Sequence, residues 1–359
     1  MSLPESMDVA VLHAVNDLRM ERRPVPRPAA GEVLIKVASV GICGSDVHYY
    51  EHGRIADFVV EKPLVLGHEA SGTIVAVGAG VPADRVGERV AMEPGIPCRA
   101  CRACKEGHYN LCPDVRFFAT PPIDGTFAEY VTLAADFAHP VPDSLSDHAA
   151  ALIEPLSVGV WACRRAGVGA GSSVLITGAG PIGLVTVQVA RALGATSITI
   201  TDVSDERLAL AARYGAHRTI NVAGGQGTVP DSSQDAFIEC SGAPDAIGTG
   251  FAAVRPAGTV VLVGMGADEL TIPVGLLQNR ELWVTGSFRY ANTYPTAIAL
   301  AAGGLVDLDS MVTGTFELAR AEDALRSTRE PGTIKSVVLP GAGSADPAAP
   351  TDPAAGTGD

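Results

Sequence analysis

The sequence predicts an α/β protein in which a doubly wound parallel sheet follows a mostly-β unit. Between residues 172 and about 285, β-branched runs such as SSVLIT and SITIT alternate with helix-like runs such as PIGLVTVQVARALG and DERLALAARYG. This alternation is typical of a parallel sheet with helices on both faces. Before about residue 140, short apolar runs are separated by Gly and Pro, which indicates an all-β, barrel-like unit.

The elements follow in order along the chain. The β unit is expected from the runs GEVLIKVASVGI, ASGTIVAVGAGV and GERVAMEP. Near residue 143 the pattern becomes helical, with Ser144 and Ser146 as candidate caps and Pro155 as a point of break or restart. The parallel sheet is expected to continue with the strands QDAFIEC, GTVVLVG and LWVTG. The fold is expected to end with an Ala-rich helix after residue 290, a helix near 320–328 and the strand IKSVVL. The last nineteen residues carry no aliphatic side chain larger than Ala and are expected to be disordered.

Composition excludes several classes of partner. The length of 359 residues suits two domains. A total of 26 Lys and Arg against 40 Asp and Glu gives a net charge of −14, which disfavours nucleic acid and anionic membranes as partners. No run reaches the roughly 18 apolar residues of a membrane-spanning helix, and the first residues lack the basic segment of a secretion signal. We therefore expect a cytoplasmic protein.

A glycine pattern directly after the strand SSVLIT predicts a nucleotide site. Gly178, Gly180 and Gly183 form G-x-G-x-x-G, which permits a tight turn, a close approach of backbone to pyrophosphate, and close packing of helix on strand. Asp202, nineteen residues after Gly183, ends the second strand, where its carboxylate can bond a ribose 2′-hydroxyl and would repel a 2′-phosphate. The pattern favours NAD over NADP. Arg207 on the next helix either flanks the adenosine or is an ordinary solvated residue.

Four cysteines within fifteen residues predict a structural zinc site. Cys98, Cys101, Cys104 and Cys112 have the spacing C-x2-C-x2-C-x7-C. Short C-x2-C steps let one loop wrap a tetrahedral ion. Because four thiolates close the coordination shell, this site leaves no position for a substrate.

A second, dispersed set of residues is compatible with a zinc site that keeps an open position. Cys43, His68, Glu69 and Glu154 offer a thiolate, an imidazole and two carboxylates, which zinc accepts in catalytic sites. Spacing alone does not establish such a site, because a lone cysteine is usually a small buried hydrophobe.

Together, five segments resemble the zinc-dependent medium-chain dehydrogenase/reductase superfamily and, within it, the sorbitol (polyol) dehydrogenases. These are 41–72, the four-cysteine segment, IEPLSVGVWACRRAGV at 153–168, TGAGPIGL at 177–184 and SFRYANTYPTAIAL at 287–300. Plain alcohol dehydrogenases of the superfamily usually carry a cysteine where this chain has Glu154. Animal sorbitol dehydrogenases lack the complete set of four cysteines, so the chain resembles a microbial-type polyol dehydrogenase.

The resemblance implies a division into domains. Residues 1–155 and 287–340 are expected to form a GroES-like catalytic domain with a structural-zinc lobe at 93–115. Residues 156–286 are expected to form a Rossmann domain that binds NAD, and 341–359 the disordered tail.

The resemblance also assigns roles around the dispersed set. Cys43, His68 and Glu69 match zinc ligands with a water completing the shell, and Glu154 would hold that water or ligate the zinc as substrate binds. Which of the two carboxylates is the resting ligand stays open. Ser45 and His48 match a hydroxyl-to-imidazole relay that carries the proton away.

The remaining positions implied by the resemblance contact substrate or cofactor. The substrate positions are Tyr49, Glu154, Arg289 and Tyr290. The cofactor positions are Gly178, Gly180, Pro181, Ile182, Gly183, Asp202, Arg207, Val263, Gly264, Met265, Ser287, Phe288 and Arg289.

The resemblance implies oxidation of a secondary hydroxyl of a polyol, such as sorbitol or xylitol, to a ketose with hydride transfer to NAD. The alternatives are a zinc-dependent dehydrogenase of a simple alcohol, a diol, threonine or a sugar acid such as idonate, and, in another class, a zinc-free reductase or a non-catalytic nucleotide-binding protein. The hydrophobic segment 272–286 suits a sheet that continues across a two-fold axis. A homotetramer is the first expectation and a dimer the second.

Overall fold

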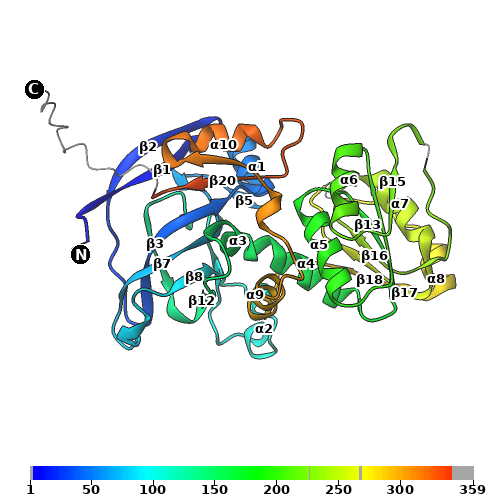
Figure 1. Ribbon diagram of the computed structural model, residues 1–359, viewed down its shortest axis with the longest axis horizontal. Helices are drawn as coiled ribbons and strands as arrows, with labels where there is room; N and C mark the ends of the chain where they lie inside the picture. Colours follow the sequence, from blue (N-terminus) through cyan, green and yellow to red (C-terminus); the bar gives the residue numbers. More distant parts are fainter. Residues whose placement is uncertain (1–2, 226, 267–268, 342–359) are drawn as a thin grey trace, which may run out of the picture.

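A computed structural model describes residues 3–225, 227–266 and 269–341. Two large sheets organise these residues, one of seven strands and one of six. Figure 1 shows them at opposite ends of the long axis, with helix α4 between them. The predicted α/β fold with a mostly-β unit and a parallel sheet is confirmed. The expected disordered tail falls, apart from Gly341, outside the described residues.

The mostly-β unit is built on the seven-stranded sheet. Its strand order is β12-β8-β7-β3-β20-β19, and β11 pairs with β3. The strands are β3 (Glu32–Gly41), β7 (Glu69–Val77), β8 (Arg89–Met92), β11 (Tyr130–Ala134), β12 (Ala138–Pro140), β19 (Val312–Glu317) and β20 (Lys335–Leu339). A second sheet of β1 (Ser6–Ala14), β2 (Asp17–Pro24) and β6 (Leu64–Val65) packs into the same core, where Leu12, Leu34, Ile35 and Phe127 are fully buried.

Several short elements lie around this sheet. They are β4 (Arg54–Ile55), β5 (Phe58–Val59), β9 (Gly95–Ile96), β10 (Arg116–Phe117), α2 (Arg102–Lys105), and 3-10 turns at Ala83–Arg85, Tyr109–Leu111, Ala135–Phe137, Asp309–Met311 and Leu318–Arg320. Helix α1 (Gly44–His52) was not expected, because SDVHYYEH carries β-favouring residues and no apolar stripe of helical period. Its N-cap is Cys43, whose backbone N–H donates to the Asp46 carboxylate at 2.9 Å.

Two consecutive helices lead from the first sheet to the second. In α3 (Asp147–Ala151), the cap is Ser146, whose Oγ accepts a hydrogen bond from Ala149 N at 2.9 Å. The alternative cap, Ser144, is therefore wrong. The break falls at Leu152, before α4 (Ile153–Arg165), and Pro155 lies in the first turn of α4, where a missing N–H breaks no helical bond.

The parallel sheet carries the nucleotide pattern. Its strand order is β15-β14-β13-β16-β17-β18, and every pairing is parallel. The strands are β13 (Ser173–Thr177), β14 (Ser197–Asp202), β15 (Arg218–Asn221), β16 (Gln234–Glu239), β17 (Val254–Leu262) and β18 (Trp283–Gly286), and the helices are α5 (Pro181–Ala192), α6 (Asp205–Arg213), α7 (Pro244–Ala253) and α8 (Val274–Arg280). The order reverses between β13 and β16, the place where open α/β sheets bind ligands.

After β18 the chain returns to the first sheet. Helix α9 (Tyr294–Ala302) packs in the same core as α4 and α5, and α10 (Ala321–Ser327) then precedes β20 in the β unit. The domain limits at 155/156 and 286/287 stay a prediction.

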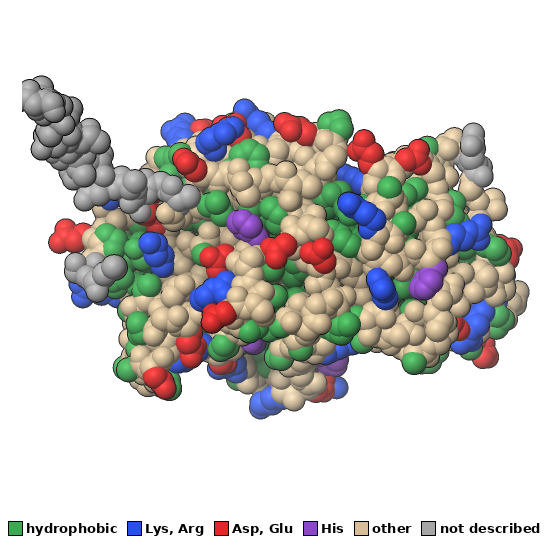
Figure 2. Space-filling view, viewed as in Figure 1, with side chains coloured by type: hydrophobic (Ala, Val, Ile, Leu, Met, Phe, Trp, Pro, Cys, Tyr) green, Lys and Arg blue, Asp and Glu red, His purple; other side chains and the backbone are tan. Residues whose placement is uncertain are grey.

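The surface carries both signs of charge. Figure 2 shows Lys and Arg side chains interspersed with Asp and Glu over the face in view. Within the described ranges, no helix is long and apolar enough to cross a membrane.

Candidate active site

A cavity of about 240 Å³ is lined by predicted residues from the mostly-β unit and from the unit of the parallel sheet. Its lining includes the metal candidates of the dispersed set and residues beside the glycine turn. The predicted residues in it are Cys43, Ser45, Tyr49, His68, Glu69, Glu154, Ile182, Val263, Met265, Ser287, Phe288 and Arg289. The structure therefore brings the expected catalytic and cofactor positions to one place.

Cys43, His68 and Glu69 form a compact donor set. One donor atom from each lies within 4.8 Å of the others. Cys43 precedes α1, while His68 and Glu69 lie where β7 begins. Asp46, which no sequence pattern indicated, is fully buried. Its carboxylate accepts hydrogen bonds from Cys43 N and Gly67 N at 2.9 Å each and lies 3.6 Å from Nδ1 of His68. Asp46 thus fixes the two loops that carry Cys43 and His68.

A second missed residue, Lys335 on β20, holds Glu69. Its Nζ donates to Glu69 Oε1 at 2.6 Å and to the carbonyl oxygen of Ile42 at 2.8 Å. Lys335 is 3% exposed and Glu69 is 1% exposed. No signal in a single sequence could have found this pair, because 266 residues separate its members.

The unpartnered oxygen of Glu69 fits a bound cation. Glu69 Oε2 is buried and has no hydrogen-bond partner among the described residues, and a buried carboxylate oxygen is costly without one. A thiolate, an imidazole and a carboxylate are ligands that zinc accepts. The residues present therefore fit a zinc ion.

Glu154 is held by a different partner. It lies in the first turn of α4, is 5% exposed, and accepts a hydrogen bond from Tyr290 Oη to Oε1 at 2.7 Å. Burial raises its pKa to about 7. Within the part of the chain that the structure describes, the compact donor set contains Glu69 but not Glu154. The choice of resting ligand between them stays a prediction.

Arg289 projects into the cavity beside two residues that the sequence analysis missed. Its guanidinium lies 3.7 Å above the ring centroid of Phe117, and its Nη2 donates to Thr120 Oγ1 at 3.2 Å. Tyr49 lines the same cavity, and burial raises its pKa to about 12. Tyr290 is instead buried behind Glu154 and does not line the cavity.

Ser45 and His48, three residues apart on α1, differ in exposure. Ser45 lines the cavity, whereas His48 is exposed and its Nδ1 lies 2.9 Å from the carbonyl oxygen of Arg54. Their role as a relay stays a prediction.

The glycine turn between β13 and α5 has the geometry that its three glycines require. Gly178 has φ +84°, and a Cβ there would lie 2.9 Å from Ser241 Cα. A Cβ on Gly183 would lie 1.8 Å from the carbonyl oxygen of Gly178, whereas a Cβ on Gly180 would meet no atom within 4 Å. The open space at Gly180, directly before Pro181 and α5, suits a pyrophosphate at a helix N-terminus.

Asp202 ends β14 beside this turn. Its carboxylate accepts hydrogen bonds from Ala179 N at 2.6 Å and from Ser204 N at 2.9 Å, so it is fixed at the turn. Gly264 packs against the loop that follows β16, because a Cβ on Gly264 would lie 2.3 Å from Gly242 N. Arg207 is half-buried in α6, and its backbone N–H donates to the capping Ser204.

The four cysteines of the lobe (residues 93–115) converge. One Sγ atom from each lies within 4.8 Å of the others. The Sγ atoms of Cys98, Cys101 and Cys112 accept backbone N–H groups at 3.3–3.5 Å. The backbone N–H of Ala100, and next that of Cys101, lower the pKa of Cys98 to about 7. These donors suit thiolates around one cation.

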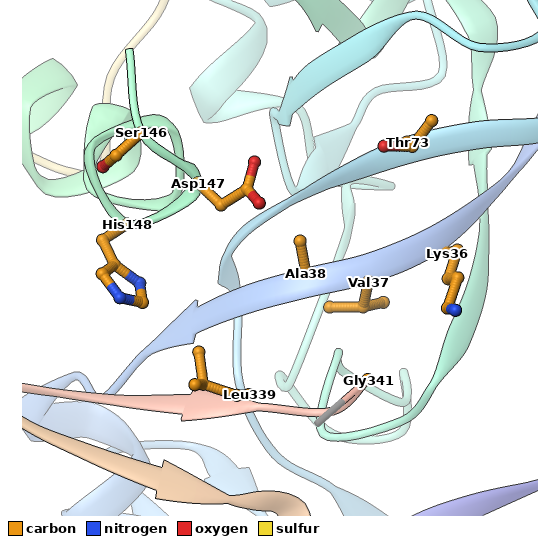
Figure 3. A pocket seen from close by; sticks show the side chains of 9 residues that line it. All are labelled: Lys36, Val37, Ala38, Thr73, Ser146, Asp147, His148, Leu339 and Gly341. Atoms are coloured by element: carbon orange, nitrogen blue, oxygen red, sulfur yellow. The ribbon is translucent and has the colours of Figure 1, made fainter. Parts of the chain in front are cut away.

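A separate hollow of about 490 Å³ lies away from these residues. Figure 3 shows it between α3 and the strands β3, β7 and β20, lined by Lys36, Thr73, His148 and their neighbours. It contains none of the candidate site residues.

Comparison with known proteins adds to this geometry. Residues 29–143 match the family profile of the alcohol dehydrogenase GroES-like domain, and residues 181–303 match that of zinc-binding dehydrogenases. The chain is 45% identical to a sorbitol dehydrogenase of Gallus gallus over 333 residues, which cover 90% of this chain and 94% of that one. It is also 45% identical to a sorbitol dehydrogenase of Bacillus subtilis over 331 residues, with the same coverage. An alcohol dehydrogenase from Escherichia coli, solved with NADH, superposes with a TM-score of 0.85 at 30% identity, covering 94% of this chain and 100% of the other.

Proposed function

The chain belongs to the sorbitol dehydrogenase family of zinc-dependent medium-chain dehydrogenases, and from this premise we propose that it oxidises a secondary hydroxyl of a polyol to a ketose. The carbon that bears the hydroxyl loses a hydride to NAD, and the hydroxyl loses a proton to solvent. The products are a ketose and NADH. Sorbitol and xylitol represent the substrate class.

One observation carries the proposal. A single cavity is lined by the donor set Cys43, His68 and Glu69 and by Ile182 and Val263, which lie beside the nucleotide turn. A substrate hydroxyl in this cavity is therefore within reach of a metal site and of a cofactor bound along the parallel sheet. Hydride transfer requires this juxtaposition of the two groups.

The residues around the metal have distinct tasks. Cys43, His68 and Glu69 would hold the zinc ion, and the unpartnered Glu69 Oε2 supports Glu69 as the resting carboxylate ligand. When bound, zinc supplies the Lewis acidity that lowers the pKa of a substrate hydroxyl. Glu154 lies in the same cavity, where it would hold the water at that position or ligate the zinc as substrate binds.

The proton leaves by way of α1. Ser45 takes it in the cavity, and His48 passes it to solvent from the exposed side of the helix. The lining of the cavity by Ser45 and the exposure of His48 support these roles. An imidazole suits a relay because its ordinary pKa is near 6.5.

Arg289 and Tyr49 favour a polyhydroxylated substrate over a simple alcohol. A guanidinium presents several donors, and the Tyr49 hydroxyl both donates and accepts, so neighbouring hydroxyls find partners in the cavity. Asp202 supports NAD over NADP, since its fixed carboxylate would repel a 2′-phosphate.

The test is a set of initial rates of NAD reduction with sorbitol, xylitol, both arabinitols, idonate, threonine, 2,3-butanediol and ethanol. Each substrate is measured with and without a zinc chelator. A chelator-sensitive preference for one polyol supports the proposal. Higher rates on a simple alcohol, diol or threonine reject the polyol assignment, and rates that survive removal of the metal reject the metal assignment.

The proposal extends to assembly and location. A homotetramer, with a dimer as second choice, is supported by the open edge of β18, where Trp283 is 74% exposed. Light scattering of the purified protein tests it. A cytoplasmic location is supported by the seven cysteines, none of which forms a disulfide bond, and cell fractionation tests it.

A further inference from the structure

The segment 288–292, which carries Arg289 and Tyr290, is held by the lobe at both ends. At its start, Asn110 Nδ2 donates to the carbonyl oxygen of Phe288 at 2.8 Å. At its end, Asn292 N donates to Tyr109 Oη at 2.8 Å, and Asn292 Nδ2 donates to the carbonyl oxygen of Gly107 at 2.9 Å. Three hydrogen bonds therefore join two segments that are about 180 residues apart in sequence.

The segment needs such restraint because its backbone is unfavourable. Arg289 has φ +51° and Asn292 has φ +55°. Asparagine adopts this left-handed region readily, but a long side chain such as that of Arg289 does so only where its surroundings impose it. Arg289 points into the cavity from this backbone, and Tyr290 reaches Glu154 from it. The lobe thus holds the conformation from which both side chains reach the site.

The clamping residues are themselves fixed. Asn110 is 5% exposed. Tyr109 Oη donates to Glu93 Oε1 at 2.5 Å, and Glu93, which is 3% exposed, lies 2.7 Å from Nε2 of His139 in β12. The lobe side of the clamp is therefore tied to the seven-stranded sheet, which also supports the metal ligands.

The lobe also borders the approach to the cavity. A hollow of about 640 Å³ is lined by Asn110, Leu111 and Cys112 on the lobe side and by Phe288 and Arg289 on the other. It shares five lining residues with the inner cavity: Phe58, Phe117, Thr120, Phe288 and Arg289. A substrate that enters from this hollow passes between the lobe and the clamped segment.

We propose that Tyr109 and Asn110 of the lobe are positioning residues for substrate: by clamping segment 288–292 they place Arg289 for a polyhydroxylated substrate and set the affinity for it. The lobe then has a second task besides holding its own cation. The inference rests on the proposed polyol substrate for its kinetic part and on the structure alone for its conformational part.

The experiment compares Asn110→Ala and Tyr109→Phe with a matched control, Arg102→Ala. Arg102 lies on the same lobe, and its side chain pairs with Glu106 at the surface; neither side chain is among the three hydrogen bonds that join the lobe to the clamped segment. For each protein we measure amide hydrogen exchange in the peptide that spans 287–293, thermal unfolding, zinc content, and kcat and KM for sorbitol, for NAD and for 2-propanol. The last substrate has no second hydroxyl for Arg289 to bind.

Both clamp variants are expected to exchange faster at 289–292 and to raise KM for sorbitol by about 5- to 30-fold, the factor that corresponds to the loss of about 1–2 kcal/mol. For both clamp variants we expect an unchanged kcat for sorbitol, unchanged kinetics on 2-propanol at saturating NAD and a zinc content of two ions per chain. Arg102→Ala is expected to behave as wild type. If Asn110→Ala folds poorly, Tyr109→Phe keeps the ring and removes only the hydroxyl.

Two results would overturn the inference. One is unchanged exchange at 289–292 in both clamp variants. The other is an equal loss of kcat/KM on sorbitol and on 2-propanol, which would indicate general damage to the site. If the wild-type protein does not oxidise polyols, the proposed function fails, while hydrogen exchange still decides whether the lobe clamps the segment.

Discussion

Replacement of Lys335 by Met tests whether the lysine is the counter-ion that keeps Glu69 in place. Methionine retains most of the length of the side chain and removes the ammonium. The carboxylate of Glu69 would then be buried at 1% exposure with neither oxygen paired, and the carbonyl of Ile42 would lose its donor. Removing one member of a buried ion pair typically costs about 3–5 kcal/mol.

That loss applies to the metal-free protein. With zinc bound, Glu69 keeps a cation within reach, so the zinc-loaded variant is expected to lose less of its free energy of unfolding than the metal-free variant. The assay is urea unfolding followed by circular dichroism at pH 8 and fixed protein concentration, with chelator and with zinc.

The matched control is Ser336→Ala, at the next position of β20. Ser336 is fully buried, and its Oγ pairs with Ser327 Oγ at 2.7 Å, away from the metal ligands. Its loss is expected to cost about 1 kcal/mol in both forms. The reasoning is refuted if Lys335→Met costs no more than Ser336→Ala in the metal-free protein, or if its cost is the same with and without zinc.

Three further substitutions test the site. Burial raises the pKa of Glu154 from an ordinary 4.5 to about 7. Between pH 4.5 and 7 the folded state therefore keeps a proton on Glu154 that the unfolded state has lost. Above pH 7 the buried carboxylate lowers the free energy of unfolding by up to about 3 kcal/mol. Glu154→Gln removes this charge and keeps the oxygen that accepts from Tyr290. The metal-free variant should therefore have a higher urea midpoint than wild type at pH 8 and the same midpoint at pH 4. Equal midpoints at pH 8 would contradict this. Asp202→Ala removes the repulsion of a 2′-phosphate and should lower the NAD/NADP ratio of kcat/KM by about tenfold or more; an unchanged ratio would place selectivity elsewhere. Arg289→Met should raise KM for sorbitol by about 10- to 100-fold, the usual range for a hydrogen bond to a charged group, and leave 2-propanol kinetics unchanged; a parallel loss on both substrates would assign Arg289 a structural role.

Sequence patterns predicted the features of this chain that are local. The glycine turn and the four cysteines of the lobe each fall within fifteen residues or fewer, so spacing alone constrains their geometry. Helix α1 escaped prediction because its Val and Tyr residues favour strands, whereas the surrounding chain makes it a helix.

The missed site residues act through tertiary contacts. Lys335 reaches Glu69 from β20, and Thr120 reaches Arg289 from 169 residues away. Neither contact leaves a trace in spacing or composition. The dispersed set Cys43, His68 and Glu69 was ambiguous from the residues and became specific through family resemblance, after which the structure brought its donor atoms together.

The position of β20 has a consequence for biosynthesis. The six strands of the parallel sheet come from one continuous stretch, 173–286, which can fold while the last part of the chain is still being made. The seven-stranded sheet cannot be completed then, because β20, at 335–339, lies inside it between β3 and β19. The scaffold for the nucleotide is therefore synthesised before Lys335, and the nascent chain cannot assemble the finished metal pocket until β20 has emerged from the ribosome.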